Sequence, residues 1–179
     1  MLYLELLFQG IVQGSIYALI ALGLTLVYGL LRILHVAHAA LFTLGGYLGV
    51  IVTNATGSFL LATAVAMIVV GFVGIAVYKL AYEPLLSKPP FISLIASIAL
   101  FIASEEIFRI IFGPYGLSYT NPPMQGYFEL FGGFFLKYGE ALVIALSVVM
   151  LVILGWFAAN TRLGVSWPVS YTHLRAHET

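Results

Sequence analysis

Residues 6–53 form an apolar stretch of 48 residues whose only formal charge is Arg32. About 20 apolar residues already cross the hydrocarbon core of a bilayer, so a run of this length predicts more than one transmembrane helix. In its first half, small residues recur at steps of three or four, which places them on one face of one helix. In lipid such a face lets another helix approach closely, whereas a simple anchor helix needs no ordered face. We therefore expect helix-packing residues at Gly10, Gly14, Ala18, Ala21 and Gly29, with Thr25 on the same face.

The composition of the whole chain agrees with a membrane protein. Hydrophobic residues make up 62% of the sequence and charged residues only 8%, against about 25% charged residues in soluble domains. Seven basic and seven acidic residues cancel, so nothing in the charge favours nucleic acid as a partner. The chain has no Cys and no Asp, and it lacks the P-loop, GxSxG and HExxH motifs. We expect no enzyme, no catalytic residue, no metal site and no cofactor.

Five transmembrane spans are predicted, which gives an all-α polytopic fold. The second span is short for a crossing, and Gly45-Gly46 inside it predicts a bend, a break or a re-entrant segment. Pro residues after the third span predict a loop that no helix crosses. The residues from 115 to 137 are rich in Gly, Pro and aromatic side chains, as is typical of interfacial structure. The spans run from about 6 to 31, 39 to 53, 58 to 80, 91 to 112 and 138 to 159.

The distribution of basic residues predicts the orientation. One set of connections carries four of them and the other set carries two, and basic residues favour the cytoplasmic side. The N-terminus is therefore expected outside. The first set is Arg32, Lys79, Lys88 and Arg162, and the second is Lys137 and Arg109.

The end of the chain differs in character from everything before it. Residues 169–179 are polar, contain His173 and His177, and resemble the translation of a sequencing-library adapter. We interpret residues 1–168 as the N-terminal part of a transmembrane domain and 169–179 as a non-native tail, the alternative being a native polar tail. Segments of this kind are excluded from reasoning about fold or metal binding.

Two histidines stand where the first apolar run meets the second. His35 and His38 are three residues apart and so lie on one side of a helix, which a metal site would also require. No carboxylate or thiol is near them in the sequence, so a metal is disfavoured. The structural interpretation is that one imidazole bridges backbone groups at a helix break. The functional interpretation is that His38 holds this junction beside a translocation path.

Three charges interrupt the fourth span: Glu105, Glu106 and Arg109. A charge near the bilayer centre costs at least about 2.5 kcal/mol, so these side chains should face protein or water. Both acids precede the base at the spacing of helical ion pairs, and a structural ion pair is the simpler interpretation. One acid must stay without a basic partner, however, and it could meet the ammonium group of a solute. With His38, Ser15 and Thr25, both acids are our candidates for a substrate path, although each hydroxyl could instead bond its own helix.

The first span and its junction resemble a known family. Residues 14–29 read GSIYALIALGLTLVYG, and they are followed by His35-Val-Ala-His38 and by Gly45-Gly-Tyr47. This pattern is similar to that of the permease subunits of branched-chain amino acid ABC transporters, the LivH-like group. That family typically shows Asn-Phe-Ala-His-Gly at the junction, so His35, Val36 and Ala39 depart from it. Weaker matches follow in the right order at Leu80–Leu85, Phe112–Pro114 and Thr161–Gly164.

The resemblance implies a pore subunit with about eight spans when complete, of which this chain holds five. It further implies a second permease subunit, cytoplasmic ABC ATPases and a periplasmic or surface solute-binding protein, in a bacterial or archaeal plasma membrane. The solute would be a branched-chain amino acid or a similar small amphiphilic amino acid, moved by alternating access. Alternatives are a permease for urea or short amides, and a self-contained channel or scaffold subunit without ATP coupling. A secondary transporter is disfavoured because no inverted repeat is visible.

Overall fold

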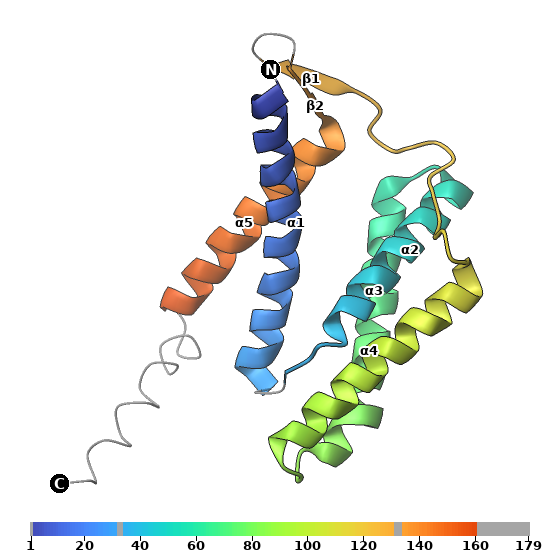
Figure 1. Ribbon diagram of the computed structural model, residues 1–179, viewed down its shortest axis with the longest axis vertical. Coiled ribbons are helices and arrows are strands. Elements are labelled where there is room, and N and C mark those ends of the chain that lie inside the picture. The colour runs from blue at the N-terminus through green and yellow to red at the C-terminus, as the bar shows by residue number, and fades with distance from the viewer. Residues whose placement is uncertain (1, 32–33, 131–133, 161–179) are drawn as a thin grey trace, which may run out of the picture. The chain divides into compact units, whose positions relative to one another are not determined.

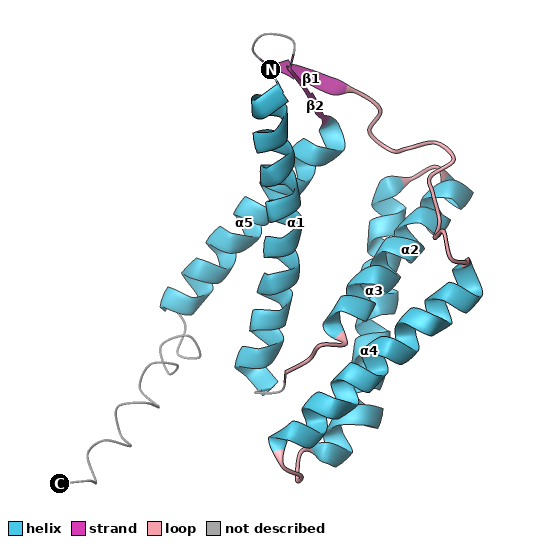
Figure 2. Cartoon of the chain, viewed as in Figure 1, coloured by secondary structure: helices cyan, strands magenta, loops and turns pink. Residues whose placement is uncertain are grey.

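The computed structural model describes residues 2–31, 34–130 and 134–160, and Figure 1 follows the chain through them. It is built almost wholly of helices, with one short pair of strands (Figure 2). Two compact units are distinguished, one of residues 1–19, 129–136 and 140–179 and the other of residues 20–128 and 137–139. The elements are α1 (Leu2–Leu31), α2 (His38–Thr56), α3 (Phe59–Val77), η1 (Tyr78–Tyr82), η2 (Glu83–Leu85), α4 (Pro90–Phe112), β1 (Tyr127–Leu130), β2 (Phe134–Lys137) and α5 (Tyr138–Asn160).

The second helix is longer and more regular than the sequence predicts. α2 runs unbroken through Gly45-Gly46, so a break of the second span at these glycines is wrong. A glycine inside a helix costs only about 1 kcal/mol relative to alanine, which the surrounding helix contacts can offset. α2 ends where Gly57 adopts a left-handed conformation with φ of 71°, and the Gly57 N–H donates to the Thr53 carbonyl over 2.8 Å. Such a glycine cap is a common helix end, and α2 ends three residues beyond the predicted end at residue 53.

α2 and α3 form a tight helical hairpin, the most extensive helix pair in their unit. Ser58 begins α3 as an N-cap, since its hydroxyl oxygen accepts a hydrogen bond from the Leu61 N–H. The third span then continues beyond α3 through the π-helix η1 and the 3₁₀-helix η2. Part of the predicted loop at Glu83-Pro84 is therefore helical, because a proline is tolerated in the first turn of a helix.

The fourth and fifth helices agree with the predicted spans. α4 begins at Pro90 and ends where Gly113 adopts a φ of 81°. The connection to α5 contains β1 and β2, which pair as a small hairpin that the sequence analysis did not predict. The Asn54 side chain fastens the start of this connection to α2. Its amide donates to the Ser118 carbonyl over 3.0 Å, and its carbonyl accepts from the Thr120 N–H over 2.9 Å.

Within residues 2–31, 34–130 and 134–160, five helical segments are long and apolar enough to cross a membrane. They start at Leu6, His38, Phe59, Pro90 and Tyr138, close to the five predicted starting points. The predicted all-α polytopic membrane fold is thus confirmed. The interpretation of residues 169–179 as a foreign tail concerns residues outside the described ranges and stays a prediction.

Candidate functional site

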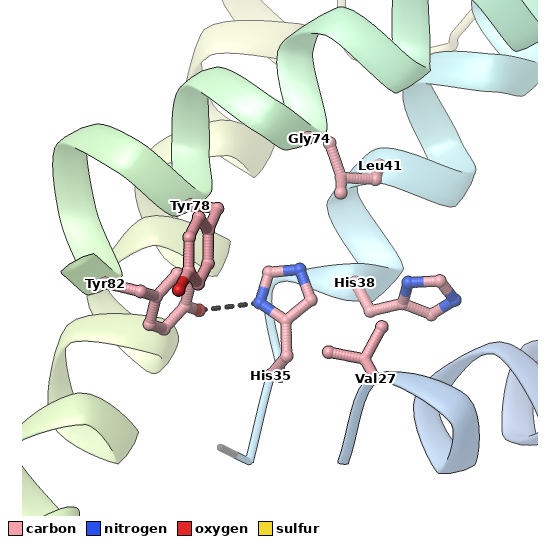
Figure 3. A pocket seen from close by; sticks show the side chains of 7 residues that line it. All are labelled: Val27, His35, His38, Leu41, Gly74, Tyr78 and Tyr82. Atoms are coloured by element: carbon pink, nitrogen blue, oxygen red, sulfur yellow. Dashed lines mark hydrogen bonds between the residues drawn. The ribbon is translucent and has the colours of Figure 1, made fainter. Parts of the chain in front are cut away.

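His35 joins the junction between α1 and α2 to the end of the third span. His35 is buried, and its Nδ1 lies 2.7 Å from the phenolic oxygen of Tyr82, the last residue of η1 (Figure 3). The two rings meet edge to face, with their centroids 5.1 Å apart. A residue of the predicted junction is therefore fixed to the end of the third span, 47 positions further along the chain.

A second hydrogen bond joins the same junction to α4. The Ala37 N–H donates to the hydroxyl oxygen of Ser97 over 3.1 Å, and Ser97 is fully buried. Ser97 also lies beside the side chain of Tyr82, so this hydrogen bond and that of His35 belong to one group of neighbouring polar side chains. Ala37 comes just before α2, where its N–H has no acceptor within the helix. Ser97 supplies that acceptor from a helix 60 positions away in the sequence.

This arrangement is electrically neutral. Burial lowers the pKa of His35 below its ordinary value of 6.5, and the imidazole of His38 lowers that pKa further. The neutral ring can accept a hydrogen bond from the Tyr82 hydroxyl at Nδ1, whereas the charged ring would have to donate there. We name His35, Ala37, Tyr82 and Ser97 the junction network; it is a buried set of polar groups whose partners lie on three different elements.

His38 lies on the opposite side of the junction, facing α1. The α-carbon of Gly23 in α1 is so close to the His38 ring that a β-carbon there would overlap Nε2 and Cε1 of the imidazole. His35 and His38 share a cavity of about 200 Å³ with Val27, Leu41, Gly74, Tyr78 and Tyr82 (Figure 3). Gly23 does not belong to the predicted packing stripe. Gly23 lies 15 residues before His38, on the other side of a helix end, and the sequence carries no signal of their contact.

A second cavity, of about 330 Å³, lies between α2 and α4 and carries the charges of the fourth span. We name it the α2–α4 cavity. Glu105 and Arg109 line it, and Glu106 does not. The remaining lining is apolar or weakly polar: Ala39, Ala40, Thr43, Tyr47, Phe101, Phe108, Gly113 and Pro114.

The two acids of α4 have different environments. Glu106 forms an ion pair with Arg109, with 3.2 Å between Oε1 and Nη1, at the i,i+3 spacing. Both side chains of this pair are more than half exposed. Within the described part of the chain, Glu105 forms no ion pair. The sequence left open which acid would remain unpaired, and the structure assigns that position to Glu105.

The remaining predicted path residues lie on α1 and bond their own helix. The Ser15 hydroxyl donates to the Ile11 carbonyl over 2.8 Å, and the Thr25 hydroxyl donates to the Ala21 carbonyl over 2.7 Å. Each oxygen still has a lone pair that can accept a further hydrogen bond. Ser15 has a second role through its carbonyl, which accepts from the buried Ser147 hydroxyl of α5 over 2.8 Å.

The predicted packing stripe of α1 is exposed at three of its five positions and half-buried at two. A β-carbon added at Gly10 or Gly14 would meet no described atom within 4 Å. Ala21 is likewise exposed, while Ala18 and Gly29 are half-buried. Among the described residues, no three His, Cys, Asp or Glu side chains gather in a metal-binding cluster.

Residues 6–172 match the family described as branched-chain amino acid transport system / permease component. This match overlaps residues 169–172 of the segment that we interpret as foreign. No solved structure matches the chain significantly.

Similar proteins are permeases of bacterial amino acid transport systems. The chain is 27% identical over 176 residues to the high-affinity branched-chain amino acid transport system permease protein BraD of Pseudomonas aeruginosa. It is 31% identical over 109 residues to LivH of Escherichia coli K12, and 29% identical over the same length to LivH of Salmonella typhimurium. These alignments cover 90% of the chain and 57% of BraD, and 56% of the chain and 35% of each LivH. The chain thus spans little more than half the length of BraD.

The family match covers nearly the whole sequence and agrees with the five membrane-capable helices and with the motif at the junction. The chain therefore belongs to the family of permease components of branched-chain amino acid transport systems.

Proposed function

We propose that this chain forms part of the pore of an importer for branched-chain amino acids or similar small amphiphilic solutes. Two partner ATPases on the cytoplasmic side would drive alternating access, and a second permease would complete the pore. A periplasmic or surface binding protein would deliver the solute to the outer face. The assembly would lie in a bacterial or archaeal plasma membrane, with the N-terminus of this chain outside.

The observation that carries this proposal is the α2–α4 cavity. Charged side chains inside membrane spans face a protein interior or a water-filled path, because lipid contact is too costly for them. This cavity combines a carboxylate with aromatic and small apolar walls, which is the usual composition of a site for a small amphiphilic molecule. Urea and short amides, in contrast, have no cationic group for Glu105 to meet.

His38, Glu105, Ser15 and Thr25 remain our proposed path residues, whereas Glu106 is no longer proposed because it lies outside the α2–α4 cavity and pairs with Arg109. The position of His38 supports its assignment to the path. Its ring packs on α1 beside the junction and is not part of the junction network. Ser15 and Thr25 are weaker candidates for the path, because their hydroxyl groups already donate hydrogen bonds to carbonyls of α1.

The proposal is tested with the complete gene, recovered from its source by sequencing past the codons for Arg162–Pro168. The full-length permease is expressed with its partner subunits in cells that lack leucine uptake. Labelled leucine should accumulate, and an ATPase variant that cannot hydrolyse ATP should abolish accumulation. Uptake that persists with the inactive ATPase would favour a channel without ATP coupling. A native reading frame that ends near Gly164 would exclude the ABC permease.

His38→Ala tests the path assignment within the same cells. We expect uptake to fall below detection while the protein still inserts at wild-type levels, as judged by the amount in purified membranes. Ser104→Ala is the control, because Ser104 only donates to the Leu100 carbonyl of its own helix. Normal uptake with His38→Ala would remove this residue from the path.

The exposed stripe of α1 is proposed as the contact with the partner permease. Gly14→Leu should reduce co-purification of that subunit, because a bulky side chain separates closely packed helices. Gly71→Leu on α3 is the matched control, since a β-carbon at Gly71 also meets nothing within 4 Å but lies outside the stripe. Equal co-purification of both variants with the partner would refute this role.

A further inference from the structure

We propose that the α2–α4 cavity is a binding site for a zwitterionic solute, with Glu105 holding the ammonium group and Arg109 facing the carboxylate. The inference rests on the proposed transport function and gives its path a defined recognition site. It also separates two adjacent acids that the sequence treats as equivalent: Glu105 binds solute, and Glu106 does not.

The arrangement of charges carries the first part of the argument. Glu105 and Arg109 are four residues apart on α4, so both side chains project from one face of the helix, the face that lines the cavity. Glu106 lies outside the cavity lining and forms the ion pair with Arg109. Two acids and one base leave one negative charge, and that charge belongs to the acid in the cavity. A cationic group of a solute would neutralise it.

The base in the cavity is only partly engaged. An Arg guanidinium carries five N–H donors, and the ion pair with Glu106 joins Nη1 to one carboxylate oxygen. The other donors can therefore meet a carboxylate of the solute. An α-amino acid carries its ammonium and carboxylate groups on one carbon. Glu105 and Arg109 lie about one helical turn apart, so the two side chains can contact these two groups at the same time.

The walls of the cavity suit the rest of such a molecule. Tyr47, Phe101 and Phe108 offer aromatic surface to an aliphatic side chain or to the ammonium group. Ala39 and Ala40 leave room beside them. The Thr43 hydroxyl donates its proton to the Ala39 carbonyl over 3.0 Å, so its oxygen can only accept, as an ammonium donor requires. A volume of about 330 Å³ lies at the small end of the range for small-molecule sites.

The cavity beside the junction network does not offer the same chemistry. Its polar groups are imidazoles and phenols without a carboxylate or guanidinium, and His35 and Tyr82 already bond each other. A divalent cation is also a poor occupant of the α2–α4 cavity, because Glu105 is the one carboxylate lining it and such ions need several oxygen ligands.

The first experiment measures leucine uptake by the complete transporter in vesicles of phosphatidylglycerol. Glu105→Gln should raise KM about tenfold or more, because a charge-assisted hydrogen bond to the ammonium group is lost. Glu106→Gln, the matched control, should change KM less than about twofold. Leucinol, an amine without a carboxylate, should inhibit the wild type and lose potency with Glu105→Gln; 4-methylpentanoate should keep its potency. Equal changes in KM for both variants, or no change, would overturn the proposal.

A second experiment does not depend on transport. The purified full-length permease is treated with a carbodiimide and an amine tag, and labelling of each carboxylate is read by peptide mass spectrometry. Leucine and leucinol should protect Glu105 but leave labelling of Glu106 unchanged. Protection of both acids or of neither overturns the site. If the vesicles show no leucine uptake but Glu105 is protected, the transport function falls and the binding site stands.

A lipid headgroup is the other source of an ammonium group at this depth. The labelling is therefore repeated in phosphatidylglycerol vesicles that also contain phosphatidylethanolamine. The proposal requires that Glu105 stays accessible to the tag until leucine is added. Protection by phosphatidylethanolamine alone would assign the cavity to lipid and overturn the solute site.

Discussion

α4 carries two polar regions, around Ser97 and around Glu105, that lie about 12 Å apart along the helix and have opposite environments. Around Ser97 the polar groups are neutral, buried and bonded to each other across three elements. Around Glu105 they are charged, exposed and open to a cavity. A buried and satisfied set of hydrogen bonds fixes a structure, whereas an open charge keeps its capacity to bind something else. The comparison therefore predicts large effects on stability at Ser97 and small ones at the charged end.

The largest effect on stability is expected from Ser97→Ala. Removing the hydroxyl leaves the Ala37 N–H buried without an acceptor, which costs about 1–3 kcal/mol of the free energy of unfolding. The measurement is reversible unfolding of the full-length protein in mixed detergent micelles. Ser104→Ala, on the same helix, should cost less than about 0.5 kcal/mol because only a bond within α4 is lost. Similar losses for the two variants would remove the distinction between the junction network and an ordinary helical serine.

A change of pH tests whether the neutral His35 ring stabilises the junction network. Because burial holds the pKa of His35 below 6.5 in the folded protein, the unfolded chain binds this proton more readily. The stability contributed by the neutral ring is therefore complete above about pH 6.5 and is lost as the pH falls below that value. Unfolding measured at pH 7.5 and at pH 5.5 should show a lower free energy at pH 5.5. His38, Tyr78 and Tyr82 are the other titratable groups lining this cavity among the described residues.

His35→Gln is the control for that assignment, because the amide cannot be charged but can still bond Tyr82. Its free energy of unfolding should change less between the two pH values than that of the wild type. A wild type that becomes more stable on acidification would show that the charged ring is favoured, contrary to its buried position.

The smallest effect is expected at the other end of α4. Glu106→Gln removes an exposed ion pair, and such pairs contribute about 0–1 kcal/mol to stability. The same unfolding measurement should place this variant within about 0.5 kcal/mol of the wild type. A loss as large as that of Ser97→Ala would mean that the charged end is a structural element, and the comparison would fail.

The sequence predicts the helices of this protein better than the contacts between them. Long apolar runs identify all five spans, since length and hydropathy are local properties. The continuity of α2 through two glycines is not a local property of the sequence, because contacts with neighbouring helices stabilise it. The β1–β2 hairpin was missed although its signal is local, because Gly132-Gly133 separates two short aromatic and apolar runs in the sequence.

The candidate site shows the same division. The spacing of Glu105, Glu106 and Arg109 predicts an ion pair and one unpaired acid, and it cannot say which acid that is. His35 was recognised as part of a junction, but its partners Tyr82 and Ser97 are 47 and more positions away. One signal was available: Ser93 and Ser97 are polar, four residues apart on a predicted span, and both are buried. Small polar residues at helical spacing in lipid often mark a contact between helices.

The π-helix η1 has a consequence for insertions and deletions. A π turn closes with a bond five residues apart, where an α turn uses four, so it accommodates one additional residue. Deleting one residue from 78–81 would therefore let the span continue as an ordinary α-helix, and the residues after the deletion would keep their positions around the helix axis. Tyr82 would then still face His35, whereas a deletion within α3 would rotate Tyr82 away from it. The length of this short segment can thus change by one residue without opening the junction, and the length of α3 cannot.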